Sequence, residues 1–176
     1  KATTGDMSVI KTFTGVMGPE YNAVGLRAMY GYMADLLTEP RWYRAHEVYT
    51  EDADLGANIM KTLVEGLQGG PANPKTKVAL TMKHFPGGGP QELGMDPHYS
   101  FGKFQYYQGN FGYHMKPFQA VIDVGVSSIM PYYGVPMSGR DGNKNPIPVT
   151  YDGVTYPLTG FAFSKEIVTD LLRGKL

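Results

Sequence analysis

The chain has 176 residues, of which 42% are hydrophobic and 18% are charged. This composition is typical of a globular domain and excludes a largely disordered chain. Sixteen basic residues balance sixteen acidic ones, which favours neither nucleic acid nor an anionic membrane surface as a partner. The apolar runs are also far shorter than the roughly 20 residues that cross a bilayer, so we expect no transmembrane helix.

The chain contains no cysteine. This excludes a disulfide framework, a thiolate metal site and a cysteine nucleophile. A chain without cysteine suits an oxidising compartment and the cytosol equally, so its location stays open, with a secreted or periplasmic one preferred. The sequence starts at Lys1 without a signal-peptide pattern, so either a leader was removed or the true start lies upstream.

Residues 1–24 are expected to form an irregular lead-in, up to about residue 15, followed by a short helix. From Gly25 an apolar run predicts a buried strand that ends before Pro40. Acidic residues 51–54 then open a helix, because negative charge is favourable at a helix N-terminus. Its inner face is predicted by apolar residues spaced four apart, which are Leu55, Ile59, Leu63 and Leu67.

Further along, residues 77–84 and 126–130 are predicted strands, and residues 113–123 a predicted helix. Ser164 is a candidate N-cap for a last helix whose inner side carries Ile167, Leu171 and Leu172. Alternating strands and helices indicate βα units and a mainly parallel sheet. The fold class is therefore α/β, as part of a (β/α)8 TIM-type barrel.

Long segments rich in glycine and proline follow the strands rather than the helices. In a βα barrel the active site is built from the loops at the carboxyl ends of the strands. The working face is therefore expected at residues 41–47, 83–98 and 131–142.

Lys83 and His84 stand at the end of a predicted strand, directly before the glycine run 87–89. Lysine supplies three donors that can hold two neighbouring hydroxyls of a ligand at a barrel mouth, and histidine can donate or accept. A salt-bridged lysine and a core histidine explain the same pattern equally well. A phosphate loop is disfavoured because Pro90 and Gln91 follow the glycines, where lysine and serine or threonine are needed.

Arg41 and Arg44 flank the only tryptophan, just after the first predicted strand. The planar fork of arginine suits two adjacent oxygens, and such an arginine needs a carboxylate to hold it. Glu47 or Glu39 can supply that carboxylate. We interpret Arg41 as structural and Arg44 as a candidate binding residue.

Several motifs occur in order along the chain. Residues 35–52 resemble the signature D-L-x-x-x-P-R-W-G-R-x-x-E-x-x-x-E-D, and residues 66–69 read G-L-Q-G. Residues 83–87 match K-H-F-x-G, residues 116–130 match a PF-x-x-A stretch that ends in methionine, and residues 168–176 resemble a helix of the type l-T-d-x-L-R-g-e-L. Together these motifs resemble glycoside hydrolase family 3. The matches cover residues 25–176, which we interpret as the central, incomplete segment of a family 3 barrel domain.

The resemblance implies roles for particular residues. Arg44, Lys83 and His84 are expected to bind hydroxyls of the sugar in the subsite that is cleaved. Tyr133 matches a tyrosine beside the nucleophile, and Met130 a methionine that lines the same pocket. Tyr43 departs from the family's usual glycine.

The catalytic nucleophile of the family does not match any residue of this chain. That nucleophile is an aspartate in a strand that follows the l-T-d-x-L-R-g-e-L helix, and the chain ends with this helix. Asp170 mimics the aspartate superficially, but it lies within the helix motif and is rejected. The family's upstream sugar-binding aspartate also has no counterpart here.

The loop that contains Asp96, Pro97 and His98 leaves a second reading open. The N-acetylglucosaminidase branch of the family uses an Asp-Ser-His sequence in this loop, with the histidine as acid/base. Proline here replaces the serine. His98 is therefore a candidate acid/base, although a role in shaping the loop or touching substrate is preferred, with the acid supplied by a carboxylate of a later domain.

The resemblance implies an exo-acting, retaining β-glycosidase, specifically a β-glucosidase. It implies no cofactor, because the chemistry needs only carboxylates, and no residue of the sequence marks a metal site, although a structural metal stays open. Its partners are a β-linked oligosaccharide or glucoside and the remainder of the same enzyme. The rival function is a non-catalytic sugar-binding fragment that kept the barrel and lost the chemistry. A strand with Ser-Asp after Leu176 would distinguish the enzyme from this rival.

Overall fold

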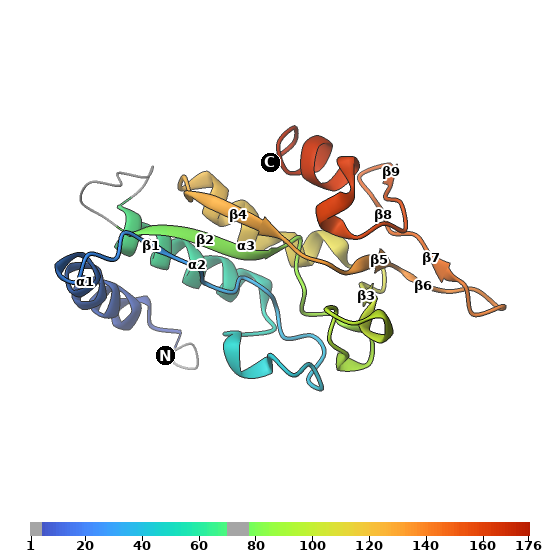
Figure 1. Ribbon diagram of the computed structural model, residues 1–176, viewed down its shortest axis with the longest axis horizontal. Coiled ribbons are helices and arrows are strands. Elements are labelled where there is room, and N and C mark those ends of the chain that lie inside the picture. The colour runs from blue at the N-terminus through green and yellow to red at the C-terminus, as the bar shows by residue number, and fades with distance from the viewer. Residues whose placement is uncertain (1–4, 70–77) are drawn as a thin grey trace.

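The computed structural model describes residues 5–69 and 78–176. Three α-helices alternate with three parallel strands along most of the chain (Figure 1). Their bounds are α1 Met7–Ala23, β1 Ala28–Met29, α2 Ala53–Gln68, β2 Ala79–Phe85, α3 Phe111–Asp123 and β4 Ser128–Pro131. This order confirms the predicted α/β class and the predicted parallel sheet.

The central sheet has the strand order β1-β2-β4, with β2 in the middle. Ala28 pairs with Ala79 on one side of the sheet, and Ile129 pairs with Met82 on the other. Helices α2 and α3 both pack against β2 and against each other, and α1 packs on α2. The carboxyl ends of the strands consequently point in one direction, as the predicted barrel requires.

Helix α2 follows the prediction for its sequence closely. Asp52 caps its N-terminus by accepting hydrogen bonds from the backbone amides of Asp54 and Leu55, at 2.9 and 2.8 Å. Gly69 ends it in the left-handed conformation, with φ of 75°, which favours glycine at this position. Ile59, Leu63 and Leu67 are buried on its inner face, and Leu55 is partly buried.

Two predictions for the first 36 residues are wrong. Helix α1 begins at Met7, inside the segment expected to be irregular up to about residue 15, and continues into the part where a short helix was predicted, with Ile10, Thr14 and Gly18 buried against the core. Small polar residues and glycines dilute its apolar periodicity, so packing on α2 decides the structure. The expected strand from Gly25 is also much shorter, because β1 ends at Met29 and pairing with β2 resumes only at a single bridge between Met33 and Lys83.

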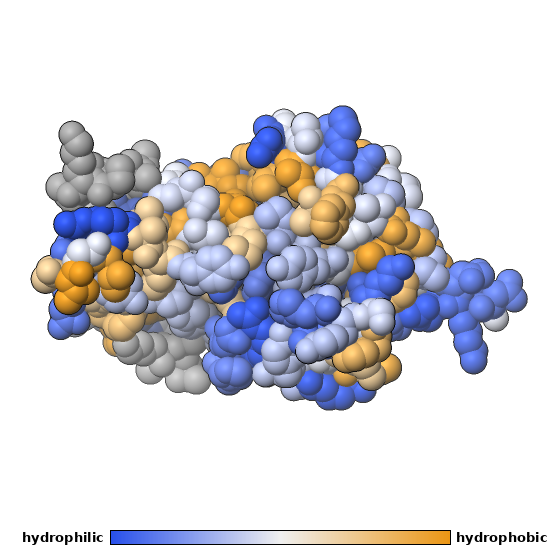
Figure 2. Space-filling model, viewed as in Figure 1, coloured by the Kyte–Doolittle hydropathy of each residue, from blue (hydrophilic) through white to orange (hydrophobic). Residues whose placement is uncertain are grey.

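The segments after β2 and β4 hold more regular structure than the expected loops. The short strands are β3 Phe104–Tyr106, β5 Val135–Met137, β6 Gly139–Arg140, β7 Pro146–Ile147, β8 Thr150–Tyr151 and β9 Val154–Thr155. Strands β3 and β5 pair in parallel although they come from different loops. Pairing between segments so distant in the chain leaves no periodic pattern of apolar residues in the sequence, so these short strands could not be predicted from it. The β6–β7 hairpin projects from the body and is covered by hydrophilic side chains (Figures 1 and 2).

The C-terminal segment is helical, as predicted, but it is not an α-helix. Glu166–Leu171 forms a π-helical turn, and the backbone amide of Ile167 donates to the hydroxyl of Ser164 at 3.3 Å. Ile167 and Leu171 are buried, which confirms the predicted inner side. Within residues 5–69 and 78–176, the structure contains no helix that is both long and apolar enough to cross a membrane.

Candidate active site

The candidate site lies where the central strands end. Lys83 and His84 are near the end of β2, and only 8% and 6% of their surfaces are exposed. The chain after β1 runs beside them, with the amide of Ala34 donating to the carbonyl oxygen of Lys83 at 2.7 Å. This pairing places Asp35 next to His84. The position is the edge of the sheet where a barrel carries its functional residues.

Asp35 is the buried centre of this site, and its side chain is completely shielded from solvent. Its carboxylate accepts hydrogen bonds from the backbone amide of His84 at 3.1 Å and from the imidazole Nδ1 of His84 at 3.0 Å. It also accepts a short hydrogen bond from the amide of Gly88. One carboxylate therefore fixes both the histidine ring and the glycine segment that follows the strand.

Arg44 approaches His84 from the other side. Its Nη1 lies 3.0 Å from Nε2 of His84, and because a guanidinium can only donate, this nitrogen must accept. The two contacts together assign the donor role to Nδ1 and the acceptor role to Nε2. Glu47 holds Arg44 with two hydrogen bonds of 2.8 and 2.6 Å, which raise the pKa of the guanidinium. Glu47, rather than Glu39, is thus the carboxylate partner of Arg44.

Lys83 lies over the ring of Tyr30, with Nζ 4.0 Å from the ring centroid. Burial lowers its pKa, the positive charge of Arg44 lowers it further, and the charges of Glu47 and Asp35 oppose this. Within the part of the chain that the structure describes, no carboxylate forms an ion pair with Lys83. Its ammonium donors are therefore available to a ligand.

Met130 joins the same wall indirectly. Its sulfur accepts a hydrogen bond of 3.1 Å from the hydroxyl of Tyr30, the residue whose ring carries Lys83. The sequence motif implied that Met130 lines the pocket. In the structure it is half-buried and reaches the cluster through Tyr30.

Two neighbouring tyrosines cover the histidine. The ring of Tyr132 lies 4.4 Å from that of His84, between centroids, and is buried with a hydroxyl that has no partner in the described part of the chain. Burial raises the pKa of this hydroxyl, and the negative charge of Asp35 raises it further. Tyr133 stacks on Tyr132 at 6.1 Å and is half-exposed. The pair extends the site from its buried base to the surface.

The loop after the glycines reaches the site through Tyr133. His98 packs edge-to-face on the Tyr133 ring at 5.0 Å, and its Nδ1 lies 2.5 Å from a carboxylate oxygen of Asp96. Burial by itself would raise the pKa of Asp96, but hydrogen bonds from the backbone and side chain of His98 bring it below its usual value. Tyr43, which replaces the family's glycine, donates to the same oxygen at 3.2 Å.

The structure therefore brings the predicted residues into two connected groups. Arg44, Lys83 and His84 surround Asp35, while His98 and Tyr133 form the outer edge. Asp170 stays apart from both, because it is half-exposed on the C-terminal helical segment and paired with Lys165 at 2.8 Å. Its position supports its rejection as the nucleophile.

Sequence reasoning assigned no role to Asp35 or Tyr132. Asp35 could have been noticed as a carboxylate that ends an apolar run, since a buried charge needs partners. Tyr132 carries no such signal in the sequence, because its contact with His84 arises from the pairing of β2 with β4.

Chemically, the site is rich in donors and poor in free carboxylates. Asp35 is bound to His84 and Gly88, and Glu47 is bound to Arg44. Arg44, Lys83 and the tyrosine hydroxyls can hold the hydroxyls of a sugar. Within residues 5–69 and 78–176, no group of three histidine, aspartate or glutamate side chains is placed to hold a metal ion. The arrangement is a polar, donor-rich wall at the carboxyl edge of an α/β barrel.

Comparison with known proteins agrees with this class. The family model described as "Glycosyl hydrolase family 3 N terminal domain" matches residues 2–176. The chain is 41% identical over 173 residues to "Beta-glucosidase C" of Emericella nidulans, covering 97% of this chain and 25% of the relative. It is 31% identical over 176 residues to the "Periplasmic beta-glucosidase/beta-xylosidase" of Dickeya chrysanthemi, covering 99% and 25%.

Solved structures show the same fold. The exo-1,3/1,4-beta-glucanase of a Pseudoalteromonas species superposes with a TM-score of 0.76 at 23% identity, covering 99% of this chain and 19% of that one. A beta-glucosidase variant of Listeria innocua in complex with laminaribiose superposes with a TM-score of 0.74 at 23% identity. The match covers 98% of this chain and 21% of that one.

The chain belongs to glycosyl hydrolase family 3 and lies within its N-terminal domain. This confirms the resemblance inferred from the motifs, and it confirms the fold class as part of a TIM-type barrel domain. The chain spans about a quarter of the length of the curated relatives it matches.

Proposed function

We propose that the protein carrying this chain is an exo-acting, retaining β-glycosidase, specifically a β-glucosidase, and that this chain supplies the sugar-binding wall of its active site. The observation that carries the proposal is the cluster in which Asp35 orients His84, Glu47 orients Arg44, and Lys83 keeps its donors free. Curated relatives named beta-glucosidase support the same reaction.

In this proposal the chain binds the sugar and the remainder of the enzyme performs the bond cleavage. Retaining glycosidases use two carboxyl groups about 5 Å apart, one as nucleophile and one as acid/base. The carboxylates nearest the binding cluster, Asp35 and Glu47, are engaged in orienting other side chains. The nucleophile and the acid/base are therefore assigned to other parts of the same protein.

Replacing Lys83 or His84 by alanine in the full-length protein tests this proposal. Lys83→Ala removes a donor to a sugar hydroxyl, and His84→Ala removes the side chain that positions Arg44, so kcat/KM for an aryl β-glucoside should fall about 10- to 100-fold in each variant. Lys61→Ala is the matched control, because Lys61 is half-exposed on α2 and pairs only loosely with Glu65 at 4.0 Å. Hydrolysis at the parental rate by both active-site variants would show that the assignment is wrong.

A second candidate reaction is the hydrolysis of β-N-acetylglucosaminides with His98 as acid/base. The hydrogen bond between His98 and Asp96 favours it, because a carboxylate can orient an imidazole for proton transfer. Parallel assays with an aryl glucoside and an aryl N-acetylglucosaminide separate the two reactions. This candidate would be favoured if the parent hydrolyses only the N-acetylglucosaminide and the His98→Ala variant loses that activity. Sugar binding without either activity would indicate a non-catalytic protein.

A further inference from the structure

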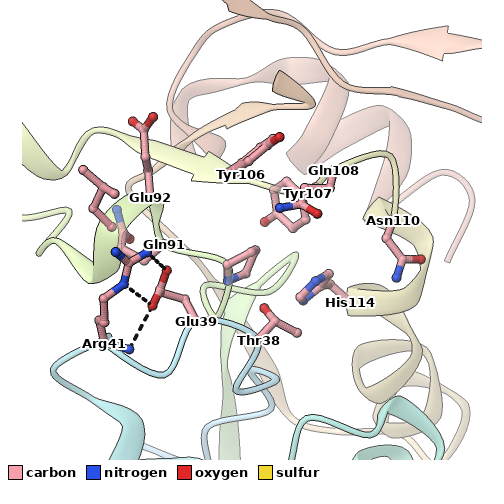
Figure 3. A pocket seen from close by; sticks show the side chains of 12 residues that line it. Thr38, Glu39, Arg41, Gln91, Glu92, Tyr106, Tyr107, Gln108, Asn110 and His114 are labelled. Atoms are coloured by element: carbon pink, nitrogen blue, oxygen red, sulfur yellow. Dashed lines mark hydrogen bonds and ion pairs between the residues drawn. The ribbon is translucent and has the colours of Figure 1, made fainter. Parts of the chain in front are cut away.

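A cavity lies outside the cluster around Asp35. It has a volume of about 540 Å³, within the range of roughly 300–1,000 Å³ that is usual for small-molecule sites. Figure 3 shows it between the segment after β1, the loop after β2 and the start of α3. Its lining includes Thr38, Glu39, Glu92, Tyr106, Asn110 and His114.

The glycine segment after β2 separates this cavity from the candidate active site. On one side the amide of Gly88 donates to Asp35. On the other side the carbonyl of Gly87 accepts a hydrogen bond of 2.6 Å from the hydroxyl of Tyr107, whose ring lines the cavity. Arg44, Lys83 and His84 do not contribute to the lining. The cavity is consequently a separate space rather than an extension of the binding wall.

His114 is a buried polar residue whose ring faces this space (Figure 3). Only 3% of its surface is exposed, and its Nδ1 is buried without a hydrogen-bond partner among the described residues. Burial lowers the pKa of His114 to about 4, although the negative charge of Asp35 acts to raise it. The ring is therefore neutral near pH 7. Burying a polar group without a hydrogen-bond partner is normally unfavourable. Such a group at the wall of a cavity points to a ligand.

The charges around the cavity are paired internally. Glu39 accepts two hydrogen bonds from the guanidinium of Arg41, at 2.8 and 2.6 Å, and Glu92 accepts two from Arg140, at 2.9 and 2.7 Å. The carboxylates therefore present no net charge to a ligand, yet their remaining lone pairs can accept hydrogen bonds. This disfavours both a simple anion and a simple cation.

The other lining groups suit a ring with many hydroxyls. Asn110 is exposed and makes no capping hydrogen bond to α3, so its amide is available both to donate and to accept. Tyr106 is 38% exposed and presents an aromatic face. Amides, paired carboxylates and an aromatic face together recognise the hydroxyls and the apolar face of a sugar ring.

We propose that this cavity is a second, non-catalytic saccharide site that holds one neutral hexose unit of an oligosaccharide. A site of this kind would keep a second part of the carbohydrate close to the enzyme while the active site acts on a chain end. This raises the effective concentration of substrate without changing the chemistry.

Calorimetric titration of the full-length protein tests the proposal. The probe is thiocellobiose, because its sulfur linkage resists hydrolysis, and the active site is occupied by excess gluconolactone, a ligand found in a structure of Listeria innocua beta-glucosidase. We expect one equivalent of thiocellobiose to bind in the presence of the lactone. Tyr106→Ala and Asn110→Ala should each weaken this binding about tenfold, with aryl β-glucoside hydrolysis unchanged.

Gln119→Ala is the matched control, because Gln119 lies on α3 outside the cavity and its side chain donates to Asp123. It should bind the probe as the parent does. Retained lactone binding shows that each variant is folded. If no probe binds to the lactone-saturated parent, or if both cavity variants bind it unchanged, the proposal is overturned. Because the variants report on the cavity itself, this result is independent of whether the protein hydrolyses glucosides.

Discussion

Asp35 and His84 are joined by two hydrogen bonds, one to the backbone amide and one to the imidazole Nδ1 of the histidine, at 3.1 and 3.0 Å. The residues lie 49 positions apart in the chain and meet because the segment after β1 pairs with the end of β2. The imidazole is thereby held in one tautomer, with Nε2 directed at Arg44. The orientation of the histidine is a property of the fold rather than of the local sequence.

We expect Asp35→Asn to reduce kcat/KM for an aryl β-glucoside about 100-fold in the full-length protein. The amide of asparagine can present a donor to Nδ1, which disfavours the tautomer that the native structure fixes. Asp54→Asn is the matched control, because Asp54 is mostly exposed and pairs with Lys116 on the surface. If the Asp35 variant and the control have the same kcat/KM, Asp35 does not orient the histidine for catalysis.

Arg44→Lys should raise KM for the glucoside at least about tenfold. Lysine keeps the positive charge but loses the planar fork that binds Glu47 twice and reaches His84. Arg41→Lys provides a close comparison, because Arg41 also binds a glutamate twice but lies outside the cluster. Steady-state kinetics should show little change in that variant. Equal effects of the two substitutions would contradict the assignment of Arg44 to the sugar-binding wall.

Acid should destabilise the folded protein partly through His114. Burial lowers the pKa of this residue from 6.5 to about 4. Between these pH values the unfolded chain binds a proton at His114 that the folded chain does not bind. The contribution of His114 to the free energy of unfolding is therefore fully present above pH 6.5 and is lost as the pH falls toward 4. The loss from this one group should be about 3 kcal/mol.

Thermal denaturation at pH 7 and pH 4 measures this contribution. Glutamine does not titrate. The Tm of the His114→Gln variant should therefore fall less between pH 7 and pH 4 than the Tm of the parent protein. His46→Gln is the control, because the His46 side chain is 76% exposed. A parent and a His114 variant with the same pH dependence would show that His114 titrates normally.

Residues 1–176 expressed alone should aggregate or remain molten. The described sheet has β1 and β4 at its edges, and unpaired strand edges recruit other chains. Apolar residues beside β4 also surround a cavity of about 490 Å³, which Ile129, Val168 and Leu172 help to line. Figure 2 shows apolar side chains in this region. A sharp cooperative melt of the isolated segment would contradict the prediction.

Local patterns in the sequence determined much of this protein. The acidic start, apolar face and glycine end of α2 specify that helix, because capping and amphipathicity are local effects. The apolar run that ends in Lys83 and His84 likewise specified β2 and placed both residues near its end. The ordered motifs also identified the family, because several of them occur together and in the same order.

Tertiary structure decided the rest. Helix α1 forms where the local pattern is weak, because Ile10 and Gly18 gain burial against the core. The pairing of β3 with β5 and the meeting of Asp35 with His84 and Tyr132 depend on segments that are distant in the chain. The sequence indicated the candidate binding side chains, whereas packing decided which carboxylates orient Arg44 and His84, because a buried charge takes its partners from whatever the fold brings within hydrogen-bonding distance.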